Sequence, residues 1–303
     1  MNPYQVNSLQ NRRLASHYLT GIILATACGL FLFSCACCSL SAGEPTNARE
    51  AAQQQQQASG ITPEILARET QRRAVMSSEQ LAWEMTLETN LGNFYLPLYY
   101  QDKDAGRETA WDYVADDPAL PRLLIIGDSI SRGYTLAVRH QLQGKFNVHR
   151  APANCGSTVT GLKQVNVWLG NGKWDIILWN FGIHDRKTGP AVYRQNLETL
   201  LQRLQHTGSK VIWARTTPAP PGKNSEGFTE AQCGQLNGIA DEVMQAGKVP
   251  EVDLYSLLKP RLAELQLPNN VHFRETGYQL MGEKVAAAVQ EIVLPPRDSP
   301  IKN

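Results

Sequence analysis

One serine stands where a nucleophile is expected. Ser129 follows Gly127-Asp128 just past an apolar run, Leu123 to Ile126, at a point where a buried strand should end and a helix begin. Backbone N–H groups at a helix start have no intrahelical acceptor, so the amide of Ser129 can stabilise the oxyanion that forms when its own hydroxyl attacks a carbonyl. The alternative is an ordinary helix cap, because Asp and Ser are favoured there as well.

The sequence lacks the patterns of three other chemistries. A nucleophile elbow of the α/β-hydrolase type needs Gly-x-Ser-x-Gly, and no serine has glycines at both positions. Beyond residue 43 the histidines are spread singly from His140 to His272, without metal-ligand spacing. Gly127 is not followed by the further glycines of a dinucleotide fingerprint. We therefore expect neither a metal nor a cofactor.

Four segments carry further polar residues in a recognisable order. They are Gly127-Asp128-Ser129-Ile130, Asn154-Cys155-Gly156-Ser157-Thr158, Phe181-Gly182-Ile183-His184-Asp185 and Asn270-Val271-His272-Phe273. From Arg122 to about Leu294 the chain resembles the SGNH hydrolases, also called the GDSL-like lipase and acylhydrolase family. The resemblance implies that Ser129 is the nucleophile, that His272 is the general base, and that the amides of Ser129 and Gly156 contribute to the oxyanion hole. It also implies cleavage of esters or thioesters, commonly acetyl groups on carbohydrates or acyl groups on lipids.

The third segment departs from the family pattern. The family usually has an Asn before the Asp, and the side-chain amide of that Asn donates to the oxyanion; here His184 takes the place. A histidine N–H can donate too, so we expect His184 in the oxyanion hole. Asn180, four residues earlier, is a second candidate, although a role in fastening the strand end suits it better.

The fourth segment lacks the carboxylate that normally orients the base. The family has Asp three residues before the histidine, and here that position is Asn269. An Asn side-chain oxygen can accept from the ring N–H and fix the tautomer, but it has no charge to stabilise the imidazolium. We expect Asn269 to complete the site with Ser129 and His272. The alternatives are a lapsed site, or an acid supplied from a distance by Asp253.

The elements that must position these residues follow from the apolar runs. From Pro121 onward, short apolar runs alternate with helical patterns, which is typical of parallel strands joined by crossover helices. The expected strands are Leu123 to Gly127, Phe146 to His149, Asp175 to Asn180, Lys210 to Thr216 and Val249 to Asp253. We predict one α/β domain over residues 118–295, with a five-stranded parallel sheet flanked by helices. The resemblance implies the three-layer, flavodoxin-like SGNH form of it, in which the site lies beyond the carboxyl ends of the strands.

The first 60 residues and the last eight are expected to lie outside any folded domain. Residues 1–43 contain no Asp or Glu, and an uncharged apolar stretch runs from Leu19 to about Leu40, which is typical of an export signal. Signal cleavage, lipoprotein-type processing and an uncleaved membrane anchor are all compatible with it, so we predict a secreted, periplasmic or membrane-anchored protein. Residues 44–60, which include a run of glutamines, are expected to be a flexible linker, and residues 296–303 a tail.

Residues 61–117 are expected to form a helical and aromatic extension. The pattern from Thr62 to Leu91 is helical, whereas Pro97 should confine the aromatic stretch from Phe94 to Tyr100 to a sheet edge or a loop. We expect the extension to pack against the domain that follows it. An aromatic cluster of this kind can also form part of a sugar-binding wall.

Charge and cysteine content narrow the classes of partner. Residues 1–43 hold two Arg and no acid, so the rest of the chain has 27 basic and 28 acidic residues, a net charge of −1. No cluster of Lys and Arg is present, and nucleic-acid binding is therefore not expected.

Four of the six cysteines lie in the signal region. The other two, Cys155 and Cys233, either form one disulfide or are two separate buried thiols.

These features together predict an exported serine esterase that hydrolyses small acyl esters, foremost acetyl esters of carbohydrates, through an acyl-serine intermediate. The alternatives are a catalytically impaired binding or scaffolding protein with the same fold, and a lipid acylhydrolase.

Overall fold

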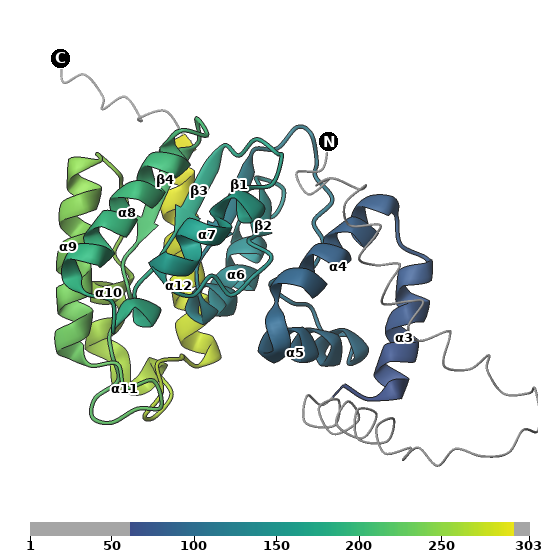
Figure 1. Ribbon diagram of the computed structural model, residues 1–303, viewed down its shortest axis with the longest axis horizontal. Helices are drawn as coiled ribbons and strands as arrows, with labels where there is room; N and C mark the ends of the chain where they lie inside the picture. The colour runs from purple at the N-terminus through teal and green to yellow at the C-terminus, as the bar shows by residue number, and fades with distance from the viewer. Residues whose placement is uncertain (1–60, 294–303) are drawn as a thin grey trace, which may run out of the picture.

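Five parallel strands form the sheet that supports the site. In this computed structural model, which describes residues 61–293, they are β1 Arg122–Ile126, β2 Asn147–Arg150, β3 Ile176–Trp179, β4 Lys210–Ala214 and β5 Glu251–Val252. Their order is β2-β1-β3-β4-β5 (Figure 1). All five expected strands are present, with ends within two residues of the predicted ones. Their Leu, Ile, Val and Trp side chains are buried because helices cover both faces of the sheet.

Two layers of helices complete the three-layer arrangement. Helices α6 Ser129–Gln141 and α12 Glu275–Val293 pack together on one face, and α7 Thr158–Leu169, α8 Pro190–Gln205 and α9 Glu230–Ala246 cover the other (Figure 1). Shorter elements complete the chain, namely η1 Ile183–Asp185 after β3, then α10 Leu254–Leu258, η2 Lys259–Arg261 and α11 Leu262–Leu265 after β5. The helices after β1 and β2 lie on opposite faces, so the gap between β1 and β3 is the switch point where such sheets bind ligands. The expected flavodoxin-like fold is confirmed.

Glycines allow α6 and α12 to approach closely. A Cβ atom on Gly282 would lie 2.4 Å from the Cβ of Ala137, and a Cβ atom on Gly133 would lie 2.1 Å from the ring of Tyr278. The contact matters for the site because α6 begins at Ser129 and α12 begins just after His272.

Within the described residues, three helices precede the sheet and lie beside its β2 edge in Figure 1: α3 Pro63–Ala74, α4 Ser78–Asn90 and α5 Gly92–Asp104. The extension packs against the domain through two tryptophans. The indole of Trp83 donates to the carbonyl of Trp111 at 2.6 Å, and the indole of Trp111 donates to the carbonyl of Ala151, just after β2, at 3.2 Å.

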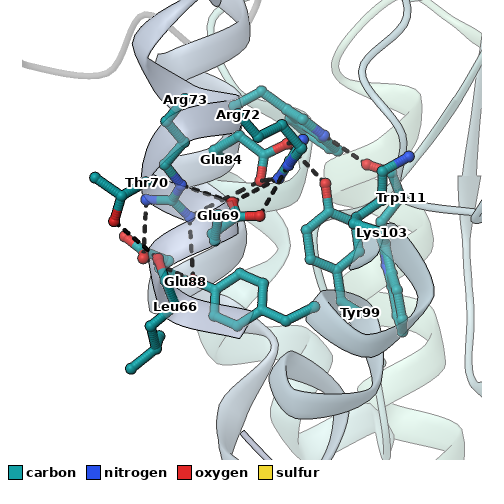
Figure 2. A network of polar contacts seen from close by, with 12 residues as sticks. Leu66, Glu69, Thr70, Arg72, Arg73, Glu84, Glu88, Tyr99, Lys103 and Trp111 are labelled. Carbon is teal, nitrogen blue, oxygen red and sulfur yellow. Dashed lines mark hydrogen bonds and ion pairs between the residues drawn. The ribbon is translucent and has the colours of Figure 1, made fainter. Parts of the chain in front are cut away.

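A buried ionic network holds the three helices together (Figure 2). Arg72 donates to Glu69 at 2.6 Å and to Glu84 at 3.0 Å, and Arg73 donates to Glu69 at 2.8 Å. The hydroxyl of Tyr99 donates to Glu84 at 2.7 Å. Burial alone would raise the pKa of Glu69, but the two arginines hold it below its ordinary value. The buried carboxylates are therefore compensated by partners, as buried charges must be.

The expectation for the aromatic stretch is wrong, because Phe94 to Tyr100 lies inside α5 with Pro97 in the helix interior. Pro97 has no N–H and so removes one helical hydrogen bond. The compensation comes from packing, since Tyr99 and Tyr100 are 1% and 4% exposed. Tertiary burial here overrides the local preference of proline.

The expected export signal, linker and tail lie outside the described residues. Among residues 61–293, no helix is both long and apolar enough to cross a membrane.

We predict opposite stability changes for two glycine substitutions in helices. Gly282→Ala should destabilise the protein by about 1–3 kcal/mol, because the new methyl group would overlap Ala137 on α6. Gly238→Ala is the matched control, since Gly238 is exposed in the interior of α9 and a methyl group added there would meet no other atom within 4 Å. It should stabilise by about 0.5–1 kcal/mol through helix propensity alone. Urea unfolding measures both changes, and equal effects would contradict the importance of the α6–α12 contact.

Candidate active site

The structure brings Ser129 and His272 together at the carboxyl edge of the sheet. The Nε2 atom of His272 lies 2.8 Å from the Oγ atom of Ser129. Ser129 is the first residue of α6, and Asp128 caps this helix by accepting from the N–H of Ile130 at 2.9 Å. The residue expected as nucleophile and the residue expected as base are thus within hydrogen-bonding distance, although 143 positions separate them in the chain.

The residue that orients His272 is Asn270 and not Asn269. The Oδ1 atom of Asn270 lies 2.6 Å from Nδ1 of His272. Asn269 is exposed and has a φ of 54°, in the left-handed region. It follows Pro268 in a turn closed by a hydrogen bond from the N–H of Asn270 to the carbonyl of Leu267, the pattern of a type II turn. This turn directs the side chain of Asn270 toward the imidazole, and Asn269 serves the turn itself.

The contacts of Asn270 fix the tautomer of His272. Its Oδ1 atom also lies 3.0 Å from the backbone nitrogen of His272, which can only donate, so the atom facing the ring must be the amide oxygen. Nδ1 therefore carries a proton, and Nε2 is free to accept from the hydroxyl of Ser129. Replacement of the acid by Asn in a serine protease costs roughly 10⁴ in rate because the wrong tautomer forms. Here the backbone N–H of His272 holds the amide oxygen of Asn270 toward the ring, so the correct tautomer forms and the site lacks only the negative charge of an acid.

Two other residues considered for the site, Asp253 as the acid and Asn180 as an oxyanion donor, have hydrogen-bond partners elsewhere. Asp253 accepts from the N–H of Ser256 at 2.9 Å and pairs with Arg215 at 3.2 Å, so it caps α10. Asn180 donates to the carbonyl of Ala214 at 2.7 Å and thereby ties the end of β3 to the end of β4. Neither residue is directed at the imidazole or at a developing oxyanion.

The environment of His272 suits a base at neutral pH. Burial lowers the pKa of His272 below its ordinary value, and Arg132 acts in the same direction, whereas the carboxylate of Asp128 opposes them. The neutral imidazole therefore predominates at neutral pH, which is the form that can take a proton from serine.

Two backbone amides are available for an oxyanion. Among the described residues, nothing accepts from the N–H of Ser129 or the N–H of Gly156. Gly156 has a φ of 66°. Its neighbour Cys155 donates to the carbonyl of Gly127 at 3.2 Å, which ties this loop to the segment that carries the nucleophile. An oxyanion hole requires free N–H donors of this kind, and the role of these two amides in it stays a prediction.

His184 lies beside the nucleophile segment, with its Nε2 atom 3.9 Å from a carboxylate oxygen of Asp128. Its side chain is 34% exposed, and its role as an oxyanion donor stays a prediction. The next residue, Asp185, has a structural role. It is fully buried and accepts from the N–H of Thr158 at 2.9 Å and from the hydroxyl of Thr158 at 2.6 Å, which holds η1 against the start of α7.

Arg150 is the buried residue of the site that sequence reasoning missed. It is 1% exposed and donates to the carbonyls of Gly127 and Asp128 at 3.0 and 2.8 Å and to the hydroxyl of Ser131 at 2.6 Å. It therefore supports the turn between β1 and α6 from below. The available signal in the sequence was an arginine at the end of an apolar run. Such an arginine more often lies in solvent at the end of a strand.

The two cysteines outside the signal region are separate thiols, so the disulfide alternative is excluded. Both Cys155 and Cys233 are free and buried, and burial raises the pKa of each to about 12. Within residues 61–293, no group of three or more His, Cys, Asp or Glu side chains is placed to hold a metal ion.

The fold and the site are those of an SGNH-type hydrolase. The sequence profile of the GDSL-like lipase/acylhydrolase family matches residues 125–280, just over half of the chain, so the chain belongs to this family. A lipase/acylhydrolase from Enterococcus faecalis is similar over 59% of this chain and 100% of its own, with 25% identity and a TM-score of 0.52. A catalytic mutant of an acetylxylan esterase from Geobacillus stearothermophilus is similar over 58% of this chain and 95% of its own, with 14% identity and a TM-score of 0.48. No curated protein matches the chain.

We predict that Ser129→Ala lowers aryl-acetate hydrolysis by roughly a thousandfold or more while changing the melting temperature little. His272→Ala should be about as damaging. The double variant should be no worse than either single variant, because the two residues act as a unit. Losses that multiply in the double variant would show that the two side chains act separately.

We predict that Asn270→Asp moves the acidic limb of the kcat/KM profile to higher pH by about one to three units. The new carboxylate would lie beside Nδ1 and favour the imidazolium, so the pKa of His272 would rise and the neutral base would be lost at a higher pH. Asn269→Asp is the matched control, because this exposed turn position should leave the profile unchanged. A shift in the Asn269 variant alone would restore Asn269 as the orienting residue.

Proposed function

We propose that this protein is an exported serine esterase that hydrolyses small acyl esters, foremost acetyl esters of carbohydrates. The observation that carries the proposal is the chain of contacts from Asn270 through His272 to Ser129, with distances of 2.6 and 2.8 Å. Export rests on the composition of residues 1–43 alone.

The geometry supports a two-step reaction. The Oγ atom of Ser129 attacks the ester carbonyl while Nε2 of His272 takes its proton, and the amides of Ser129 and Gly156 stabilise the tetrahedral oxyanion. The imidazolium then returns the proton to the departing alcohol, which leaves an acyl-serine. A water molecule then attacks the acyl carbonyl while His272 takes its proton. The bond to Ser129 Oγ breaks, the imidazolium returns the proton to this oxygen, and the carboxylic acid leaves.

The surroundings of the nucleophile favour a short acyl group. Three polar side chains, Asp128, Arg132 and His184, lie around the hydroxyl of Ser129 and the imidazole of His272. A long acyl chain would gain little beside these polar groups, because it is stabilised chiefly by contact with apolar surface.

We predict that the purified protein releases acetate from aryl acetate and from acetylated polysaccharides, and that it is at least roughly tenfold slower on octanoyl than on acetyl aryl esters. Release of nitrophenol across the chain-length series, between about pH 5 and 9, measures the preference. Ser129→Ala is the control for uncatalysed hydrolysis. A preference for octanoyl esters would indicate a lipid acylhydrolase, and no turnover of any ester would indicate a binding protein with an impaired site.

A further inference from the structure

Helix α5 presents an aromatic pair at the edge of the active site. Phe94 is 69% exposed, and its ring meets the ring of Tyr95 edge-on at 4.8 Å. The ring of Tyr95 in turn lies 5.5 Å from that of Trp111. Because Trp111 is 2% exposed and bonded to the carbonyl of Ala151, it holds the pair in place against the end of β2.

Arg132 connects this pair to the nucleophile. It lies one helical turn after Ser129 on α6, so the two side chains leave the helix on the same side. Its guanidinium carbon is 5.6 Å from the ring centre of Tyr95 and 5.8 Å from that of Trp111. Tyr95 itself is half-buried at this position, and burial raises the pKa of its phenol.

Arg132 has no carboxylate partner among residues 61–293, and its buried Nε atom has no hydrogen-bond acceptor there. The nearby carboxylate, Asp128, is already engaged by the N–H of Ile130. The buried guanidinium of Arg150 adds a second positive charge beneath the same turn. The two carboxylates that act on His272, Asp128 and Glu226, each have a partner already, since Glu226 lies 3.8 Å from Arg186. Arg132 can therefore pair with an anion from outside the chain.

We propose that Phe94, Tyr95 and Arg132 form a leaving-group subsite for an acidic saccharide, that is, a sugar ring that bears a carboxylate near the esterified hydroxyl. The exposed ring of Phe94 offers an apolar face to the sugar, and the ring of Tyr95 supports it edge-on. The guanidinium of Arg132 binds the carboxylate with its planar pair of donors. The subsite rests on the proposed esterase function, because it places the ester carbonyl in front of Ser129.

The test compares three substrates on the full-length protein: an aryl acetate, a neutral acetylated mannan and acetylated polygalacturonate. Wild type should prefer the acidic polymer to the mannan, and the preference should fall as salt is raised. Arg132→Met should lower the ratio of kcat/KM on acetylated polygalacturonate to kcat/KM on aryl acetate by roughly tenfold, mainly through KM. Arg132→Lys, which keeps the charge but loses the planar fork, should restore part of the ratio.

Two further variants make the outcome decisive. Phe94→Ala removes an exposed ring that contributes little to folding, and it should weaken both polymers relative to the aryl acetate. Arg194→Met removes a cation that pairs with Glu242 on the far helices α8 and α9, and it should leave all three rates unchanged. Turnover of aryl acetate without an effect of Arg132→Met on the ratio would overturn the subsite alone. Absence of turnover on every substrate would overturn the esterase function, and the subsite with it.

Discussion

The close contact between α6 and α12 controls the relative position of the reacting groups. Ser129 is the first residue of one helix, and His272 lies just before the other, so any change in the separation of the helices changes the distance between Oγ and Nε2. Gly133 and Gly282 remove the side chains that would keep the helices apart. Strand β1 supplies the other constraint, because its carboxyl end fixes where α6 begins.

The loops at this edge of the sheet are joined by buried and half-buried polar side chains that take no part in proton transfer. Arg150 holds the carbonyls before the nucleophile, Asp185 joins η1 to the start of α7, and Asn180 joins β3 to β4. Each of these groups would be costly to bury without a partner, so the hydrogen bonds stabilise the loops in these positions. The same loops carry the amides of Ser129 and Gly156.

The strands were within reach of the sequence because short apolar runs depend on local pattern, and the pairing of Ser129 with His272 was implied by the resemblance to the SGNH hydrolases. The orienting residue was not. The family spacing of three residues before the histidine points to Asn269. Because the backbone of Asn269 is in the left-handed region, the side chain that contacts the imidazole is that of Asn270, and spacing alone does not predict this. Arg150 was missed and Pro97 was misjudged for a related reason. Their positions depend on partners distant in the chain, Arg150 on the turn after β1 and Pro97 on the burial of α5.

The position of Tyr95 has a consequence for how such an enzyme changes over evolutionary time. The segments that carry out bond cleavage all lie between Gly127 and Phe273, whereas Tyr95 and Phe94 belong to α5, ahead of the first strand. Substitutions in the extension would therefore alter the proposed leaving-group subsite and leave the residues between Gly127 and Phe273 unchanged. Substrate preference and hydrolytic chemistry would then be inherited through different parts of the chain.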